Sequence, residues 1–217
     1  MTHSFNLIDE PWIPCLHFDG KLEEFSLRQV LLNAHNILGI QGDSPLETAS
    51  IYRLLLSVMH SAMRGPTDRK EWRQLWFQER WSEELINPYL DRWHNRFDLF
   101  DAQRPFFQAV DTRAKAKSAI SLVIDMASGN NASLFDHHIE EVGVSLSPSK
   151  AVRALITAQF FGLAGLFLPG APFTDAPWGR GIIFFLEGDN LYKTLVMNTL
   201  QYPNPEFHDI FGCDQPA

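Results

Sequence analysis

Hydrophobic side chains recur every three or four residues through most of this chain, the spacing expected for one face of an α-helix. The clearest run follows Ser44-Pro45, a capping serine with proline at the first helical position, and stops at Gly65-Pro66. Aromatic residues at helical spacing, such as Trp72 and Trp76, are interpreted as core residues rather than base-stacking surfaces. Similar spacing predicts further helices over residues 27–34, 68–79, 83–97, 147–168 and 189–200.

Short apolar runs of strand length occur near the N-terminus and again close to residue 184. They predict strands over residues 5–8, 12–18, 21–25 and 182–186. Asp19-Gly20 tolerates positive φ and would form a hairpin turn, and Ser26 with Gln29 has the spacing of a helix capping box. The sequence therefore predicts an α+β fold that is mostly helical, with short strands at the N-terminus and around 182–186.

Composition fits one globular unit. The 217 residues are 45% apolar and 12% aromatic, which is enough for a core and excludes low-complexity disorder. Cys15 and Cys213 are too far apart to suggest a disulfide framework or a paired metal knuckle. The first residues lack a signal-peptide pattern, and the longest apolar run, 154–168, is too short for a membrane helix. We therefore expect a cytoplasmic protein without membrane contact.

Charge is distributed unevenly along the chain. The formal net charge is -8, which argues against strong nucleic-acid binding by the chain alone. Residues 142–186 are the locally basic part, because they contain three basic residues, Lys150, Arg153 and Arg180, and only one acidic residue, Asp175. If the chain contacts nucleic acid, we expect the contact in this region, with Lys150 and Arg153 as phosphate-binding candidates.

Two loops carry the residue types that recognise nucleic acid. The first joins flexible backbone, amide groups, an aromatic ring and an imidazole, which can stack on an unpaired base and bond to its edge. The second would let backbone approach a groove closely, because glycine and alanine are small. The candidate residues are Gly129, Asn130, Asn131, Ala132, Ser133, Leu134, Phe135, Asp136 and His137 in the first loop, and Pro169, Gly170 and Ala171 in the second.

A metal site is the alternative interpretation of the same region. Asp136, His137, His138 and Glu140 have ligand chemistry suited to zinc or iron, and a metal-dependent hydrolase could be built on them. Adjacent residues in one loop cannot all face a single ion, and the i, i+4 histidines of a metalloprotease helix are absent. We therefore expect no bound metal and no cofactor.

Four segments stand out in order along the chain. They are Phe5-Asn6-Leu7-Ile8-Asp9-Glu10-Pro11-Trp12-Ile13-Pro14, Arg104-Pro105-Phe106-Phe107-Gln108, the loop from Ser128 to His137, and Asp175-Ala176-Pro177-Trp178-Gly179-Arg180-Gly181 with Glu187-Gly188-Asp189. Together they resemble the large subunit (CasA family) of the type I-E CRISPR surveillance complex, Cascade. The resemblance covers nearly all 217 residues, and the family's chains are about twice as long.

The resemblance implies a non-catalytic subunit at the 5′ handle of the CRISPR RNA (crRNA). Such a subunit helps recognise the protospacer-adjacent motif (PAM) in double-stranded target DNA and start R-loop formation. Its partners would be the crRNA, the target DNA, the backbone, handle-end and small subunits of Cascade, and the recruited helicase-nuclease. The loop of residues 129–137 matches the family's loop that reaches the crRNA handle, with Phe135 on its aromatic position.

Residues 169–171 match the place of the family's PAM-contacting glycine-rich loop, although only Gly170 is a glycine here. The resemblance also implies that residues 1–217 form the N-terminal domain of the subunit, without its C-terminal helical bundle. A third interpretation remains open beside this one and the hydrolase: a purely structural assembly subunit whose loops contact only other proteins.

Overall fold

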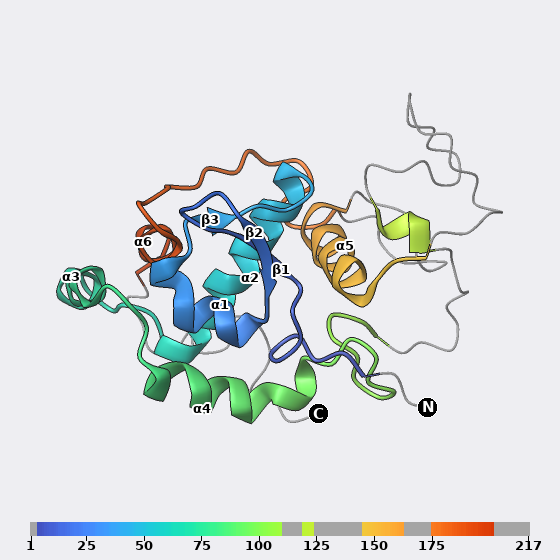
Figure 1. Ribbon diagram of the computed structural model, residues 1–217, viewed down its shortest axis with the longest axis horizontal. Coiled ribbons are helices and arrows are strands. Elements are labelled where there is room, and N and C mark those ends of the chain that lie inside the picture. Colours follow the sequence, from blue (N-terminus) through green and yellow to red (C-terminus); the bar gives the residue numbers. More distant parts are fainter. Residues whose placement is uncertain (1–3, 110–118, 124–144, 163–174, 202–217) are drawn as a thin grey trace.

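The computed structural model describes residues 4–109, 119–123, 145–162 and 175–201 (Figure 1). Helices dominate this part of the chain, and one small antiparallel sheet accompanies them. The predicted α+β class, mostly helical, is confirmed. The helices are α1 Leu27–Asn33, α2 Pro45–Met63, α3 Arg69–Gln78, α4 Glu83–Trp93, α5 Pro148–Phe161 and α6 Leu191–Met197, with short 3-10 turns η1 Ala34–Asn36, η2 His94–Arg96 and η3 Ala119–Leu122.

The sheet is a hairpin with a third, two-residue strand on its other edge. Strands β1 Ile13–Leu16 and β2 Leu22–Phe25 pair in antiparallel register, and β3 Gly39–Ile40 pairs with β1, giving the order β2-β1-β3. The turn predicted at Asp19-Gly20 is present, and Gly20 has the φ of +83° that only glycine adopts readily. The hairpin is therefore specified by local sequence.

Side-chain caps begin most of the helices where the sequence predicted. Ser26 accepts a hydrogen bond from the Gln29 amide while the Gln29 side chain accepts one from the Ser26 amide, a complete capping box. Ser44 caps α2 through the Glu47 amide, and Ser147 caps α5 through the Lys150 amide. Each cap satisfies a backbone amide that the first helical turn leaves free.

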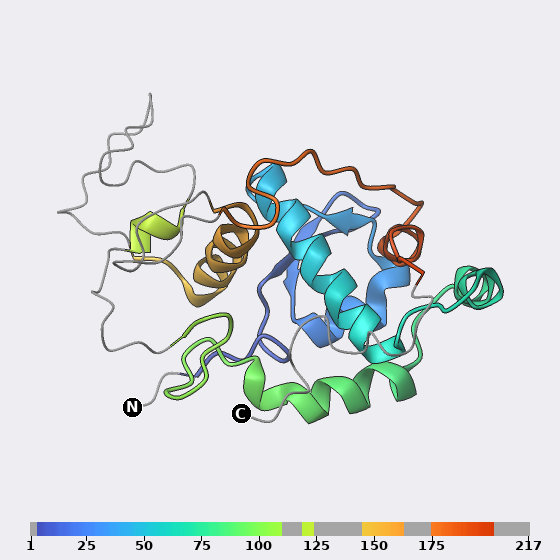
Figure 2. The same ribbon diagram turned by 180° about the vertical axis from the view of Figure 1, so that it is seen from behind.

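Helix α2 is the centre of the packing. It lies across the sheet and α1 and contacts α4, α5 and α6 (Figure 2). The core includes Trp12, Leu55 and Tyr192, which are fully buried, and the Trp12 indole donates a hydrogen bond to the Leu7 carbonyl at 2.9 Å. Each such large side chain contributes about 1.5–3 kcal/mol through removal of apolar surface from water. Both figures place α3 and α5 on opposite sides of α2.

Three predicted elements differ from the structure. Residues 5–8 form no strand: Asn6 makes one isolated bridge with Asp98 and the chain then turns. Residues 182–186 are not a strand either, because this apolar segment has no sheet partner among the described residues. Helix α5 ends at Phe161, and Gly162 takes an extended conformation with ψ of 129°, whereas the apolar pattern predicted helix to residue 168.

Candidate nucleic-acid interface

Helix α5 lies between the two candidate loops in the sequence. The loops themselves, residues 129–137 and 169–171, lie outside the described residues, as does the alternative metal cluster at 136–140. The structure does describe the framework that carries them. Three residues separate the undescribed stretch 124–144 from the start of α5, and Gly162 directly precedes the stretch 163–174.

The described residues on either side of the stretch 163–174 meet on the last turn of α5. The Ala176 amide donates a hydrogen bond to the Gly162 carbonyl at 2.7 Å, and the Trp178 amide donates one to the Phe160 carbonyl at 2.9 Å. Residues 176–178 therefore lie along the last turn of α5, beside Gly162. Pro169, Gly170 and Ala171 belong to a segment whose two attachment points are held together by backbone hydrogen bonds.

An arginine from α2 stabilises this attachment. The guanidinium carbon of Arg53 lies 4.4 Å from the ring centroid of Phe160 and 4.4 Å from that of Trp178. Burial lowers the pKa of Arg53, and its Nη1 atom is buried without a hydrogen-bond partner among the described residues. The two aromatic faces provide the favourable electrostatic environment that a hydrogen-bond acceptor would otherwise supply, a contribution of about 0.5–2 kcal/mol for each contact.

Aromatic contacts extend from this attachment to the other segments of the resemblance. Phe107 contacts Phe160 edge to face at 6.1 Å between centroids and stacks on Phe106 at 4.4 Å, and the Gln159 side chain donates a hydrogen bond to the Phe107 carbonyl at 3.0 Å. Phe106 in turn stacks on Phe97, whose carbonyl accepts the Leu7 amide at 2.9 Å. Three of the four sequence segments, residues 5–14, 104–108 and 175–181, are thus joined through one set of contacts.

Arg153 does not serve the role predicted for it. Its side chain is 4% exposed and forms ion pairs with Glu24 on β2 at 2.5 Å and with Glu47 on α2 at 2.8 Å, and it donates a hydrogen bond to the Trp12 carbonyl at 3.0 Å. The prediction that Arg153 binds nucleic acid is therefore wrong for this structure. A count of charges along the sequence does not show which side of α5 faces the core, and Arg153 is on that side.

Two other basic residues of this region remain at the surface. Lys150, in the first turn of α5, is exposed, and its contact with phosphate stays a prediction. Arg180 is exposed and forms an ion pair with Asp175, the acid at the other end of the 175–181 segment. The local positive charge predicted for residues 142–186 is thus reduced to Lys150 and one paired arginine among the described residues.

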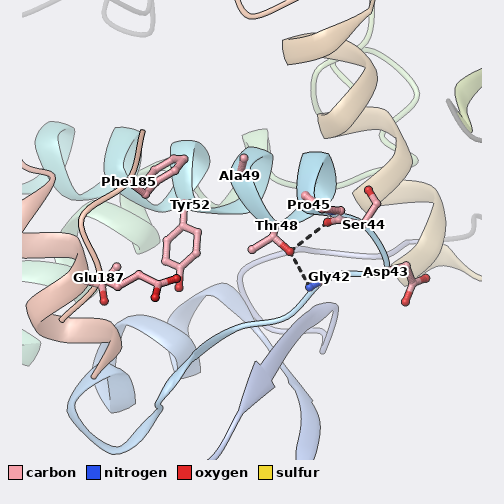
Figure 3. A pocket seen from close by; sticks show the side chains of 10 residues that line it. Gly42, Asp43, Ser44, Pro45, Thr48, Ala49, Tyr52, Phe185 and Glu187 are labelled. Atoms are coloured by element: carbon pink, nitrogen blue, oxygen red, sulfur yellow. Dashed lines mark hydrogen bonds between the residues drawn. The ribbon is translucent and has the colours of Figure 1, made fainter. Parts of the chain in front are cut away.

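A small apolar hollow lies beside this region, between the loop of residues 42–45, the start of α2 and the segment 185–187 (Figure 3). Its volume is about 340 Å³. Its polar groups serve the fold: Thr48 donates to the Ser44 carbonyl and accepts from the Gly42 amide, both at 3.0 Å, and the Tyr52 hydroxyl accepts from the Ile40 amide at 3.2 Å. The sequence pattern did not predict this hollow, and its two carboxylates, Asp43 and Glu187, lie at opposite ends of it (Figure 3).

Neither a metal cluster nor a membrane-spanning helix is present in the described part of the chain. No group of three or more His, Cys, Asp and Glu side chains there is placed to hold a metal ion. Cys15 is buried, and burial raises the pKa of its thiol, so it lacks the character of a reactive cysteine. None of the described helices is both long and apolar enough to span a bilayer.

Comparison with known proteins shows the family to which this chain belongs. The family described as CRISPR-associated protein Cse1 matches this chain over residues 6–217. The chain belongs to the Cse1 family. A CRISPR-associated protein CasA/Cse1 from Thermus thermophilus is 39% identical over 202 residues, which are 91% of this chain and 40% of that protein. The resemblance to the CasA family noted in the sequence is confirmed.

Solved structures of Cse1 proteins share the fold. Thermobifida fusca Cse1 matches with a TM-score of 0.78 at 32% identity, over 90% of this chain and 39% of that one. Acidimicrobium ferrooxidans Cse1 matches with a TM-score of 0.75 at 32% identity, over 92% and 39%. A chain of a CRISPR RNA-guided surveillance complex has the same fold, with a TM-score of 0.79 at 22% identity over 90% and 43%. This Cse1-family chain spans about two fifths of the length of the relatives it matches.

Proposed function

We propose that this chain is part of a non-catalytic subunit of a type I-E CRISPR RNA-guided surveillance complex, with residues 1–217 as its N-terminal domain. The observation that carries the proposal is the match to the Cse1 family over residues 6–217, supported by the shared fold. The partners would be crRNA, double-stranded target DNA with its PAM, the backbone, handle-end and small subunits, and the recruited helicase-nuclease. The location would be the cytoplasm.

In this function the two loops at the ends of α5 contact different nucleic acids. Residues 129–137 dock on the crRNA 5′ handle, with Phe135 stacking on a base or filling an apolar site beside it. Residues 169–171 approach the PAM in the minor groove through their backbone. The joined attachment points at Gly162 and Ala176 support the second role, because a reading loop needs a rigid base. Exposed Lys150 supplies a positive charge on the helix that both loops share.

The energetics of DNA opening make a modest contact sufficient. The minor groove mainly distinguishes A·T from G·C pairs, so a backbone loop there gives tolerant PAM choice. Exchange of a DNA duplex for an RNA–DNA hybrid is nearly balanced in free energy, so a small protein contribution at the first base pairs decides whether opening begins. The net charge of -8 fits a subunit that relies on partner subunits for most phosphate contacts.

Replacement of Phe135 by alanine tests the crRNA contact. We expect Phe135→Ala to weaken retention of the chain on the crRNA-bearing complex by about tenfold, since stacking on one base contributes about 1–3 kcal/mol. The measurement is the amount of this chain that co-purifies with crRNA after co-expression with the other subunits. Phe18→Ala is the matched control, because Phe18 is a 61% exposed phenylalanine in the β1–β2 hairpin.

Three outcomes would contradict the proposal. Unchanged co-purification of Phe135→Ala would remove the docking role from this loop. Crosslinks from residues 129–138 to protein and never to RNA would make the chain a purely structural assembly subunit. A stoichiometric transition metal in the purified protein, lost on His137→Ala, would favour the metal-dependent hydrolase based on Asp136, His137, His138 and Glu140.

A further inference from the structure

Helix α3 presents an outward face whose orientation is fixed by packing. Its inner side chains Trp72 and Trp76 stack on each other at 5.7 Å between centroids, and the Trp72 indole donates a hydrogen bond to the Val196 carbonyl of α6 at 3.0 Å. The Tyr192 hydroxyl donates to the Leu75 carbonyl. These contacts hold one side of α3 against α6, and both ribbon views show the other side directed away from the molecule at its far end from α5.

Basic residues and one aromatic ring share this outward face. Arg69, Arg73 and Phe77 follow one another at four-residue spacing, so each is rotated by about 40° from the previous one, and Lys70 lies about 20° beyond Phe77. The four side chains therefore occupy about 100° of the helix circumference. A shallow open hollow runs along them, lined by Arg69, Lys70, Arg73, Gln74, Phe77 and Gln78.

The positive charges on this face are not neutralised by the described residues. Among these, no ion pair or side-chain hydrogen bond involves Arg69, Lys70 or Arg73. The acids at the start of the helix have other partners: Asp68 accepts the Glu71 amide at 2.8 Å, and Glu71 accepts the Thr67 amide at 2.7 Å and the Thr67 hydroxyl at 2.8 Å.

This local positive charge is opposite in sign to the net charge of the chain, and its position on the helix is electrostatically unfavourable. Residues 64–80 contain five basic and three acidic residues, in a chain whose net charge is -8. Arg69 and Lys70 occupy the first turn of α3, where the helix dipole disfavours positive charge. A local arrangement that costs stability is expected where a surface has a binding role.

Phe77 identifies the kind of anion that this face suits. Its side chain is 72% exposed and lies one turn beyond Arg73 on the same face, with Gln74 and Gln78 lining the same hollow. A duplex keeps its bases stacked on each other and offers no partner to this ring, whereas an unpaired strand offers both phosphates and free base faces. The glutamine amides can bond to base edges or sugars. Charge and aromatic surface together therefore favour a single strand.

We propose that the outward face of α3, formed by Arg69, Lys70, Arg73 and Phe77, binds single-stranded nucleic acid with little sequence preference. The arginines and the lysine contact successive phosphates, and the Phe77 ring stacks on one base. This face is distinct from the surface of α5, because α3 and α5 lie on opposite sides of α2 (Figure 1). It does not depend on the crRNA and PAM roles proposed above.

Two variants of the full chain separate the electrostatic part of this site from the stacking part. The probe is a fluorescein-labelled oligothymidylate of about 20 nucleotides, long enough for one site, and anisotropy is measured over a salt series. We expect Arg69→Gln with Arg73→Gln to lower the slope of log affinity against log salt by about 1.4, since each phosphate contact on a single strand contributes about 0.7. Phe77→Ala should weaken binding about tenfold with the slope unchanged, and Phe77→Trp should restore it.

The control changes the same net charge elsewhere. Lys21→Gln with Arg96→Gln removes two exposed basic residues outside α3 and should leave affinity and slope close to native. All variants keep Trp72 and Trp76, which pack α3 against α6, so we expect their fold to be unchanged. An unfolding temperature equal to that of the native chain checks this. The proposal is overturned if the native chain binds the probe no better than the double arginine variant. It is equally overturned if the control loses as much affinity, or if a duplex of equal length binds more tightly and is unaffected by Phe77→Ala.

Discussion

Arg153 shows how one charged side chain can tie three elements together. It lies in α5 and forms ion pairs with Glu24 on β2 and Glu47 on α2, while it donates a hydrogen bond to the Trp12 carbonyl ahead of β1. Burial raises the pKa of Glu47, and attraction to Arg153 limits that rise. A buried carboxylate depends on such a partner, because its charge is otherwise removed from water without compensation.

Replacement of Arg153 by methionine should therefore destabilise the fold by about 3 kcal/mol near pH 7, since Glu47 would be buried without its partner. The loss should shrink toward about pH 4. A raised carboxyl pKa means that the native state binds protons more strongly than the unfolded state, so stability falls as pH rises from the ordinary value of Glu through the native value. Without Arg153 the pKa of Glu47 rises further, so the variant loses more stability than the native chain as the pH rises. Urea unfolding over that pH range measures the effect.

Lys150→Met is the matched control for this prediction, because Lys150 is exposed on the same helix and should change stability by no more than about 0.5 kcal/mol. A loss of stability that is equal at all pH values would show that Arg153 acts through packing of its aliphatic stem rather than through its ion pairs.

The contact between α5 and the segment 175–181 holds Ala176 beside Gly162 at the end of the helix. Trp178 makes most of this contact: its ring meets Phe160, Phe161 and Phe185 at 5.6–6.2 Å between centroids, and Arg53 lies against it. Its backbone amide donates to the Phe160 carbonyl. The backbone hydrogen bonds set the register of the segment on the helix, and the aromatic contacts keep it there.

We expect Trp178→Ala to cost about 2–3 kcal/mol, less than for a fully buried tryptophan because this ring is half-buried. The amides of Ala176 and Trp178 should exchange with deuterium faster, since their hydrogen bonds lose the packing that protects them. Phe184→Ala is the control, because Phe184 is a large side chain of the following segment and is 86% exposed. Equal protection of both amides in Trp178→Ala and the native chain would show that the hydrogen bonds alone hold the segment.

Across the whole molecule, sequence reasoning succeeded where structure is local and failed where it depends on distant partners. The hairpin at Gly20 and the caps at Ser26 and Ser44 were predictable, because turn and cap chemistry acts over a few residues. The apolar run 182–186 has strand composition, yet a strand also needs a neighbour, and no described segment supplies one.

The same limit applies to the candidate sites. Neither the burial of Arg153 nor the exposure of Phe77 could be inferred from spacing, since both depend on which side of a helix another helix covers. The resemblance of four ordered segments did predict the family, because it uses the order of residues along the chain rather than their contacts.

The PAM contact proposed for the second loop can be tested only in the assembled complex, because a chain of net charge -8 should bind duplex weakly alone. We expect Gly170→Leu to lower affinity for PAM-bearing duplex about tenfold or more, since a branched side chain would keep the loop backbone from the groove floor. Retention on crRNA should be unchanged, which separates this effect from assembly. Gly181→Leu is the control, because a side chain there points into largely open space, with its nearest contact at 3.9 Å. Equal affinity of the Gly170→Leu and native complexes for PAM-bearing DNA would take PAM reading away from this loop and leave it a structural connection at the end of α5.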